Sequence, residues 1–351
     1  MKISVFAVSL VLAASSLQSL VDIEKQLPVK AFYEARQRLQ GIAYHTPLLY
    51  SSNLSEKYDC NVFVKREDLQ VVRSYKIRGA YNKMMSTPKE LLDKGVVCAS
   101  AGNHAQGVAF ACAKLKVKCK IFMPAQAPKQ KVNKVRGFGR EYIEIILTGK
   151  NFDEAFAAAD EYTRRTGSTF VHPFNDLKVI AGQGTVGLEI IEDIDLPIDY
   201  LFGAIGGGGF ISGVSSLFRQ LSPETKIIGV EPTGAASMFQ SLQAGVPTQF
   251  QNLDPFVDGA AVGKPGDLTF DICKQTLTEI LVVPEGKVCT SILELYNDEG
   301  IVVEPAGALT IASLDFYKDK IKGKTIVVVI SGGNNDVNRT EDIQRRSKEY
   351  E

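Results

Sequence analysis

The sequence predicts an α/β protein in which helices cover a mostly parallel sheet. Short apolar runs alternate with helical stretches over residues 61–171, and short links join them. A second series of such units follows residue 173 and ends in a continuous apolar run at 325–330. Glycine- or asparagine-rich segments come directly after three of the apolar runs. Ligands collect at the strand ends of such sheets, so these three segments are the first candidates for a site.

The order of elements follows from the spacing of apolar residues. Residues 29–40 have apolar and charged faces at helical spacing, and Pro47 lies in the break that follows. Residues 240–266 are loop-rich. Strands are expected at 61–65, 95–100, 118–123, 142–147, 170–171, 200–205, 226–230 and 325–330. Helices are expected at 29–40, 53–58, 74–85, 103–114, 128–136, 152–165, 180–191, 267–276 and 287–298, with another after residue 209 that ends at Leu221.

Composition excludes several classes of partner. The chain has 351 residues, enough for two domains, with 45% hydrophobic and 23% charged residues. The formal net charge is zero, so no nucleic acid and no anionic membrane is expected as a partner. Three histidines make a histidine-rich metal site unattractive. The six cysteines form no Cys-x-x-Cys pair and lie mostly in apolar runs, which indicates free thiols in a reducing compartment.

The N-terminus supports two interpretations. Met1-Lys2 precedes an apolar run from Ile3 to Ala14, too short to span a bilayer but similar to a secretory signal. The alternative is an N-terminal helix with Leu17, Leu20, Val21 and Leu27 on one face. The free thiols favour a cytoplasmic protein.

The segment 74–80 (SYKIRGA) contains a lysine suited to chemistry. Ser74 is a good N-cap, which would place Lys76 at the positive end of a helix dipole. With Arg73 and Arg78 nearby, the ammonium form is disfavoured and more neutral amine is available for a Schiff base. Taken alone, a lysine such as Lys76 is most often an ordinary exposed helix lysine, so the rest of the chain must decide.

Four glycines, Gly206, Gly207, Gly208 and Gly209, follow an apolar strand and precede a helix. Without Cβ atoms, their N–H groups can turn together toward phosphate oxygens, and the helix dipole adds to the attraction. The pattern is neither a Walker loop nor the spaced dinucleotide motif, and it suits one phosphate monoester. A flexible linker is the alternative, but linkers rarely join an apolar strand to a helix.

Two further strand ends carry polar groups. Residues 100–104 (SAGNH) offer backbone N–H groups that can hold a carboxylate, although Asn103 also suits a helix cap and His104 a packing role. Ser331 follows the last apolar run, where its hydroxyl can donate to a neutral nitrogen or cap the next segment. A lysine, a monophosphate cup, a carboxylate loop and a hydroxyl together fit an aldehyde with one phosphate, pyridoxal 5′-phosphate.

Here the chain resembles the tryptophan synthase β-like (fold type II) group of pyridoxal-phosphate enzymes, and within it the threonine dehydratase family. The resemblance spans about residues 29–345. It rests on seven motifs in order: KREDLQVVRSYKIRGA (65–80), SAGNHAQGVA (100–109), AGQGTVGLEI (181–190), GGGGFISG (206–213), FVDGAAV (256–262), VEPAGA (303–308) and SGGNND (331–336).

The resemblance implies two open, mostly parallel twisted sheets with helices on both faces and the cofactor between two domains. It implies a discontinuous large domain (20–88 with 173–345), a smaller α/β domain (89–172) and an extra segment at 1–19. The chain ends at Glu351, about where a regulatory domain that binds isoleucine begins in biosynthetic members, so that domain is expected to be absent. A homodimer or homotetramer is expected.

The resemblance also implies residue roles. Lys76 would hold the cofactor as a Schiff base, and Tyr75 would pack beside it where phenylalanine is usual. Asn103 would bind the 3′-oxygen, and Ser331 would face the pyridine nitrogen and leave it largely unprotonated, which suits elimination. Gly206 to Gly209, with Phe210, would bind the phosphate. The substrate carboxylate would lie on Ser100, Ala101, Gly102, Asn103 and His104.

The implied reaction is deamination of L-threonine to 2-oxobutanoate and ammonia, or of L-serine to pyruvate. Lys76 would remove the Cα proton, and the β-hydroxyl would leave with a proton from the cofactor phosphate. Related serine racemases have a serine as second base where Ala101 stands, which argues against racemisation. They also have an acidic metal ligand six positions after a Glu-Pro pair. Here that position after Glu231 is Ser237, so no metal is expected.

Alternative functions remain within and outside the fold. A serine racemase, or another β-eliminating or β-replacing enzyme, would use the same fold. A non-catalytic binding protein would have kept the fold without the chemistry. A visible absorption band and the chirality of the product from L-serine separate these possibilities.

Overall fold

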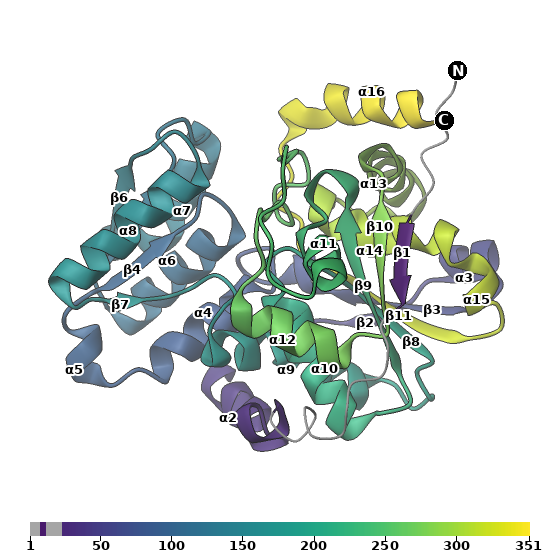
Figure 1. Ribbon diagram of the computed structural model, residues 1–351, viewed down its shortest axis with the longest axis horizontal. Coiled ribbons are helices and arrows are strands. Elements are labelled where there is room, and N and C mark those ends of the chain that lie inside the picture. The colour runs from purple at the N-terminus through teal and green to yellow at the C-terminus, as the bar shows by residue number, and fades with distance from the viewer. Residues whose placement is uncertain (1–7, 12–22) are drawn as a thin grey trace.

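The computed structural model describes residues 8–11 and 23–351. Within these residues the strands form two sheets, which Figure 1 shows side by side. The larger sheet has the order β1-β10-β9-β8-β11-β3-β2. Its strands are Val8–Val11 (β1), Leu48–Tyr50 (β2), Asn61–Arg66 (β3), Tyr200–Ala204 (β8), Lys226–Pro232 (β9), Glu279–Val283 (β10) and Thr325–Ile330 (β11).

The strands inside the larger sheet are parallel. Pairs β10–β9, β9–β8, β8–β11 and β11–β3 all run in the same direction, and Thr325 of β11 lies opposite Asn61 of β3. Only the edge strands β1 and β2 are antiparallel to their neighbours. Strand β11 has all its residues buried because helices cover both faces, which explains its continuous apolar sequence.

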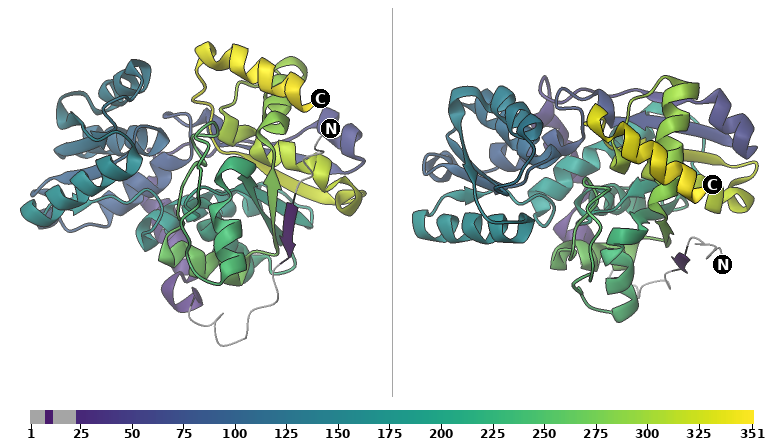
Figure 2. Two further views of the ribbon diagram at one scale, coloured as in Figure 1. Left: turned by 45° about the horizontal axis from the view of Figure 1, so that its top comes forward. Right: turned by 90° about the horizontal axis from the view of Figure 1, so that it is seen from above.

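The smaller sheet is wholly parallel, in the order β6-β5-β4-β7. Its strands are Val96–Ala99 (β4), Cys119–Met123 (β5), Ile143–Leu147 (β6) and Thr169–Phe170 (β7). The helices between them are Asn103–Leu115 (α6), Lys129–Gly139 (α7) and Phe152–Thr166 (α8). This unit lies at the left of Figure 1, and the views in Figure 2 keep it beside the larger sheet.

Helices pack on both faces of the larger sheet. One face is buried against α3, α13, α14 and α16, and the other against α9, α10, α11 and α12. Helices α2 and α4 pack on α9. The bounds are Val29–Leu39 (α2), Ser52–Tyr58 (α3), Lys76–Met85 (α4), Lys89–Leu92 (α5), Leu177–Asp193 (α9), Gly209–Leu221 (α10), Ser237–Ala244 (α11), Asp267–Thr276 (α12), Glu285–Glu299 (α13), Pro305–Ser313 (α14), Lys318–Ile321 (α15) and Thr340–Tyr350 (α16).

The predicted α/β class with two mostly parallel sheets is confirmed, and most predicted elements lie within a few residues of their observed bounds. Among the described helices and strands, those that the pattern missed are β1, β2, β10, α5, α11, α14, α15 and α16. The prediction that Ser74 caps the lysine helix is wrong. Helix α4 begins at Lys76 after Tyr75, and the Ser74 backbone forms a bridge with Gly332 instead.

The N-terminal interpretations largely concern residues that the structure does not describe. Of the run from Ile3 to Ala14, the described part, Val8–Val11, forms β1 and pairs with β10. Leu17, Leu20 and Val21, which define the alternative helix, lie outside the described residues. Among the helices that the structure does describe, none is long and apolar enough to cross a bilayer. All six cysteines are free and buried, as predicted.

Candidate active site

A cavity of about 360 Å³ lies where the strands of both sheets end. It opens beside the carboxyl ends of β4, β8 and β11, the position at which parallel sheets bind ligands. Every residue that the sequence proposed for the site lines it: Tyr75, Lys76, Ser100, Ala101, Gly102, Asn103, His104, Gly206, Gly207, Gly208, Gly209, Phe210 and Ser331.

Lys76 begins helix α4 and extends its amine into this cavity. Its Nζ donates to the carbonyl oxygen of Pro173 at 3.1 Å and lies 5.3 Å from the centre of the Tyr75 ring. The Tyr75 ring packs on Phe210, with 4.7 Å between ring centroids. Burial lowers the pKa of Lys76 to about 8, and the negative charge of Glu304 opposes that shift. Near neutral pH, a larger fraction of Lys76 than of an ordinary lysine is therefore in the neutral, nucleophilic form.

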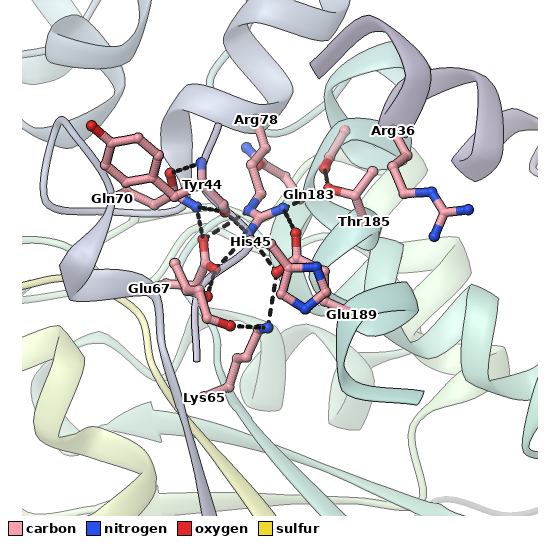
Figure 3. Close-up of polar contacts among 12 residues, drawn as sticks. Arg36, Tyr44, His45, Lys65, Glu67, Gln70, Arg78, Gln183, Thr185 and Glu189 are labelled. Carbon is pink, nitrogen blue, oxygen red and sulfur yellow. Dashed lines mark hydrogen bonds and ion pairs between the residues drawn. The ribbon is translucent and has the colours of Figure 1, made fainter. Parts of the chain in front are cut away.

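The direction of this pKa shift agrees with the sequence prediction, but the predicted cause is wrong. Arg73 and Arg78 are not what lowers the pKa of Lys76; burial is. Arg78 points into a separate buried cluster, shown in Figure 3, where carboxylates neutralise its charge. The alternative that Lys76 is an ordinary exposed lysine also fails, because its amine lies in the cavity wall.

The cluster around Arg78 holds helix α4 in place (Figure 3). The Arg78 guanidinium donates to Glu67 from Nε at 2.8 Å and from Nη2 at 2.7 Å. It also donates to Glu189 of α9 from Nη1 at 2.6 Å and from Nη2 at 2.9 Å. Lys65 Nζ forms an ion pair with Glu189 at 2.8 Å. All four side chains are buried, and Lys65 Nζ also pairs with the partly exposed Asp193 at 3.3 Å, so each buried charge has an opposite charge as its partner.

The pKa values in this cluster follow from its pairing. Burial by itself would lower the pKa of Arg78, but Glu67 and Glu189 raise it above its usual value. Burial would raise the pKa of Glu189, yet Arg78 and Lys65 hold it below the ordinary value. Arg78 and Glu189 therefore stay charged at neutral pH, and the cluster is a fixed support for the residues of α4.

The four glycines form a tight turn between β8 and α10. A Cβ on Gly207 would lie 2.2 Å from Cδ1 of Phe174, and one on Gly208 would lie 2.9 Å from Cβ of Thr269. Gly208 also has φ of +91°, a conformation that side chains disfavour. Thr269 Oγ1 donates to the Gly207 carbonyl oxygen at 2.6 Å and fixes the turn. The segment is thus a packed cradle before a helix N-terminus, and the alternative of a flexible linker fails.

The loop 100–104 joins β4 to α6. The amide of Gly102 donates to Ser100 Oγ at 3.1 Å, and Gly102 occupies the N-cap position. Asn103 therefore does not cap the helix: its Nδ2 donates to Glu304 Oε1 at 2.6 Å. The first N–H groups of α6 have no partner within the helix and lie at the cavity, where an anion can bind them.

His104 and Ser331 also line the cavity, and each donates a hydrogen bond to a backbone carbonyl oxygen. His104 Nε2 lies 2.8 Å from the Val171 carbonyl oxygen and donates to it, while Nδ1 has no partner among the described residues. Burial and the charge of Lys76 lower the pKa of His104 to about 3, so its ring is neutral. Ser331 Oγ lies at the end of β11 and donates to the Ala306 carbonyl oxygen at 3.2 Å.

Several cavity residues were not singled out from the sequence. Glu304 precedes α14, and Asn334 follows Ser331; both line the cavity and contact Asn103. Lys131 of α7 forms an ion pair with Asp258 across the mouth of the cavity. Glu304 and Asn334 belong to the motifs VEPAGA and SGGNND, so the signal was present, but no local pattern distinguishes their side chains from capping residues.

The described residues contain no group of three or more histidine, cysteine, aspartate or glutamate side chains arranged to hold a metal ion. Glu231 instead accepts hydrogen bonds from the backbone N–H groups of Met238 and Phe239, both at 2.8 Å. It thereby satisfies the first turn of α11.

The chain is similar to known proteins in both sequence and structure. Residues 39–332 match the family model described as pyridoxal-phosphate dependent enzyme. The chain is 57% identical over 317 residues to the biosynthetic L-threonine dehydratase IlvA of Halalkalibacterium halodurans, covering 90% of this chain and 76% of that protein.

Two solved structures are similar over most of both chains. The processed form of threonine deaminase isoform 2 from Solanum lycopersicum superposes with a TM-score of 0.86 and 38% identity, covering 96% of each chain. Serine racemase from Dictyostelium discoideum superposes with a TM-score of 0.81 and 32% identity, covering 89% of this chain and 100% of that chain.

Proposed function

This chain belongs to the pyridoxal-phosphate dependent enzyme family, and from that premise we propose that it is an L-threonine dehydratase. It deaminates L-threonine to 2-oxobutanoate and ammonia, and L-serine to pyruvate and ammonia. The observation that carries the proposal is that the Lys76 amine and the glycine cradle line one cavity. The biosynthetic designation of the curated relatives supports a role at the start of isoleucine synthesis.

The residues of the cavity fit pyridoxal 5′-phosphate. The glycine cradle leaves no room for side chains, so backbone N–H groups of Gly206 to Gly209 are available to its phosphate. Lys76 holds the aldehyde, Asn103 the 3′-oxygen, and Ser331 the pyridine nitrogen. When bound, the cofactor supplies an aldehyde that condenses with amines and a ring that withdraws electrons from the substrate Cα.

The protein contributes positioning and proton transfer. The backbone N–H groups at the start of α6, in the loop from Ser100 to His104, bind the substrate carboxylate. The Lys76 amine, once the substrate amine has replaced it at the aldehyde, would accept the proton from the substrate Cα, and the pKa of about 8 in the cofactor-free protein favours its neutral form. Loss of the β-hydroxyl and hydrolysis of the resulting enamine complete the net conversion to a 2-oxo acid and ammonia.

Serine racemisation is the second candidate, because solved serine racemases superpose on this chain. Racemisation needs a second base that delivers a proton to the opposite face of Cα. Ala101, in the cavity wall, has no ionisable group to do so. We therefore favour dehydration. Chiral analysis of the reaction with L-serine tests this choice: appreciable D-serine contradicts it.

The decisive experiment measures 2-oxobutanoate released from L-threonine by protein reconstituted with pyridoxal phosphate. Lys76→Ala is expected to lose at least about a hundredfold in turnover and to lose the visible absorption band. Lys83→Ala is the matched control, since Lys83 lies on the same helix but pairs with Asp176. Wild-type protein that stays colourless after reconstitution contradicts the proposal.

Three further features are part of the proposal. The two sheets mark two domains, a discontinuous one (20–88 with 173–345) and a smaller one (89–172). The enzyme works in the cytoplasm, which its six free thiols support. It forms a homodimer or homotetramer, which light scattering of the purified holoenzyme tests.

A further inference from the structure

Glu304 is a buried carboxylic acid in the wall of the active-site cavity. Only 4% of its surface is exposed, and it directly precedes helix α14. A Cβ on Gly332 would lie 2.6 Å from its Oε1, so the backbone packs closely against the carboxylate. Within residues 8–11 and 23–351 it forms no ion pair. Such a group is costly to bury unless its hydrogen bonds compensate.

Amides supply those hydrogen bonds. Asn103 Nδ2 donates to Glu304 Oε1 at 2.6 Å, and the backbone N–H of Asn334 donates to Oε2 at 3.1 Å. The Asn334 side chain donates from Nδ2 to Asn103 Oδ1 at 2.8 Å. The Asn103 amide is therefore held on both sides, with its NH₂ toward Glu304 and its oxygen toward Asn334.

This pairing permits one orientation of the Asn103 amide. Rotating it by half a turn would place its oxygen against the Glu304 carboxylate and its NH₂ against the NH₂ of Asn334. Both contacts would be repulsive. In the observed orientation, Asn103 Nδ2 donates one of its two hydrogens to Glu304, and the second hydrogen is available to another acceptor. An N–H donor is what an oxygen acceptor at the 3′ position of the cofactor requires.

The contacts also join the two sheets. Asn103 begins α6 and Lys134 lies in α7, both on the side of the smaller sheet. Glu304 and Asn334 adjoin α14 and β11, on the side of the larger sheet. Lys134 Nζ donates to Asn334 Oδ1 at 3.4 Å, so the hydrogen-bonded chain from Glu304 through Asn103 and Asn334 ends at a lysine. The orientation of Asn103 thus depends on groups from both sides of the cavity.

We propose that Glu304 is a positioning residue: it fixes the Asn103 amide so that an N–H, and not the carbonyl oxygen, faces the cofactor. The inference rests on the proposed function, in which Asn103 binds the 3′-oxygen. It identifies a residue that acts on the cofactor through another side chain, at a position that the sequence motifs left without a role.

The charge state of Glu304 makes this role depend on pH. Burial and the nearby charge of Asp258 raise its pKa to about 7, while the hydrogen bonds from Asn103 and Asn334 limit the rise. Protonation removes an acceptor and weakens the constraint on the amide. The titratable and charged groups that face Glu304 are Tyr75, Lys76, Lys131, Lys134 and Asp258.

The test compares the dissociation constant of pyridoxal phosphate and the visible absorption spectrum of the holoprotein in wild type and Glu304→Gln. Gln replaces one acceptor by a donor, so the amide of Asn103 loses its unique orientation. Cofactor binding is expected to weaken about tenfold, with a displaced absorption maximum. Glu279→Gln is the matched control, because Glu279 is also buried, with 2% of its surface exposed. It is the first residue of β10, whereas the cavity lies at the carboxyl ends of the strands.

A double-mutant cycle separates positioning from general disruption. In an Asn103→Ala background, Glu304→Gln is expected to change cofactor affinity by less than about twofold, because the group through which it acts is gone. Equal losses in both backgrounds, or no loss in either, overturn the inference. Glu304→Asp keeps the charge but shortens the reach to Asn103, and it provides a second variant if Gln prevents folding. Wild-type protein that binds no pyridoxal phosphate overturns the proposed function instead.

Discussion

Two buried carboxylate clusters lie near Lys76, and they differ in how the negative charge is compensated. In the cluster of Figure 3, Glu67 and Glu189 both bind the Arg78 guanidinium. At the cavity, Glu304 is buried to a similar extent, but within the described residues its hydrogen bonds come from amide groups. The pKa of Glu189 is held below its usual value, whereas that of Glu304 is raised to about 7.

The difference shows that burial alone does not decide the behaviour of a carboxylate. Burial favours the neutral acid at both Glu189 and Glu304. A bidentate arginine reverses that preference at one, and amide donors only reduce it at the other. Glu189, paired with the Arg78 guanidinium, keeps its charge over the physiological range, and its cluster serves as support. A carboxylate without a cation titrates near neutral pH, as groups at functional sites often do.

The largest expected effect comes from removing the cation of the paired cluster. Arg78→Met leaves Glu67 and Glu189 buried with only Lys65 to compensate them. The free energy of unfolding is expected to fall by about 3–5 kcal/mol. Urea denaturation of the cofactor-free protein measures it. Arg36→Met is the control, because Arg36 and Glu192 form a partly exposed ion pair, and it is expected to cost less than about 1 kcal/mol. Equal decreases in the free energy of unfolding of the two variants would show that the buried ion pairs stabilise the protein no more than an exposed one.

A smaller effect, which depends on pH, is expected at the unpaired carboxylate. Because folding raises the pKa of Glu304 to about 7, the folded state binds this proton more tightly than the unfolded chain. The stability that Glu304 contributes is therefore present below pH 4 and lost as pH rises through 7, by about 3 kcal/mol.

Glu304→Gln removes this dependence. The free energy of unfolding of wild type minus that of the variant is expected to decline between pH 5 and pH 8 and to level off above. Urea denaturation of both cofactor-free proteins across this range measures it. Parallel curves for the two proteins would mean that Glu304 does not titrate in this interval, and the contrast with Glu189 would then disappear.

The sequence predicts which residues line the cavity far better than it predicts the contacts of the two carboxylate clusters. The four glycines and Ser331 come directly after apolar runs, as does the loop 100–104, and parallel strands bring such positions to one edge. Local order along the chain therefore suffices to place them together. The family motifs then supply roles for the same residues, and the cofactor and reaction class agree with the similar proteins.

The contacts that fix charge states could not be predicted in this way. Asn103 and Glu304 are separated by 201 residues, and Arg78 and Glu189 by 111. From local sequence Asn103 is a good helix cap, but its tertiary contact with Glu304 replaces that role. Helix α14 was missed because its apolar residues cover all sides and show no helical period. The cause assigned to the Lys76 pKa was wrong for the same reason: burial is a property of the folded chain.

The smallest expected effect concerns the pKa of Lys76, which the charge of Glu304 raises directly. Burial lowers its pKa to about 8 and Glu304 opposes that shift, so its reductive methylation by formaldehyde and cyanoborohydride should follow the fraction of neutral amine. That fraction rises about fivefold between pH 7 and pH 8 and less than twofold between pH 8 and pH 9. Peptide mass spectrometry of the cofactor-free protein measures the rate at Lys76, with Lys83 on the same helix as reference. In Glu304→Gln the midpoint should move to lower pH, whereas Glu279→Gln should leave it unchanged. If the pH midpoint of Lys76 methylation moves in Arg78→Met and not in Glu304→Gln, the charge of Arg78 controls the pKa of Lys76, and the proposed influence of Glu304 is wrong.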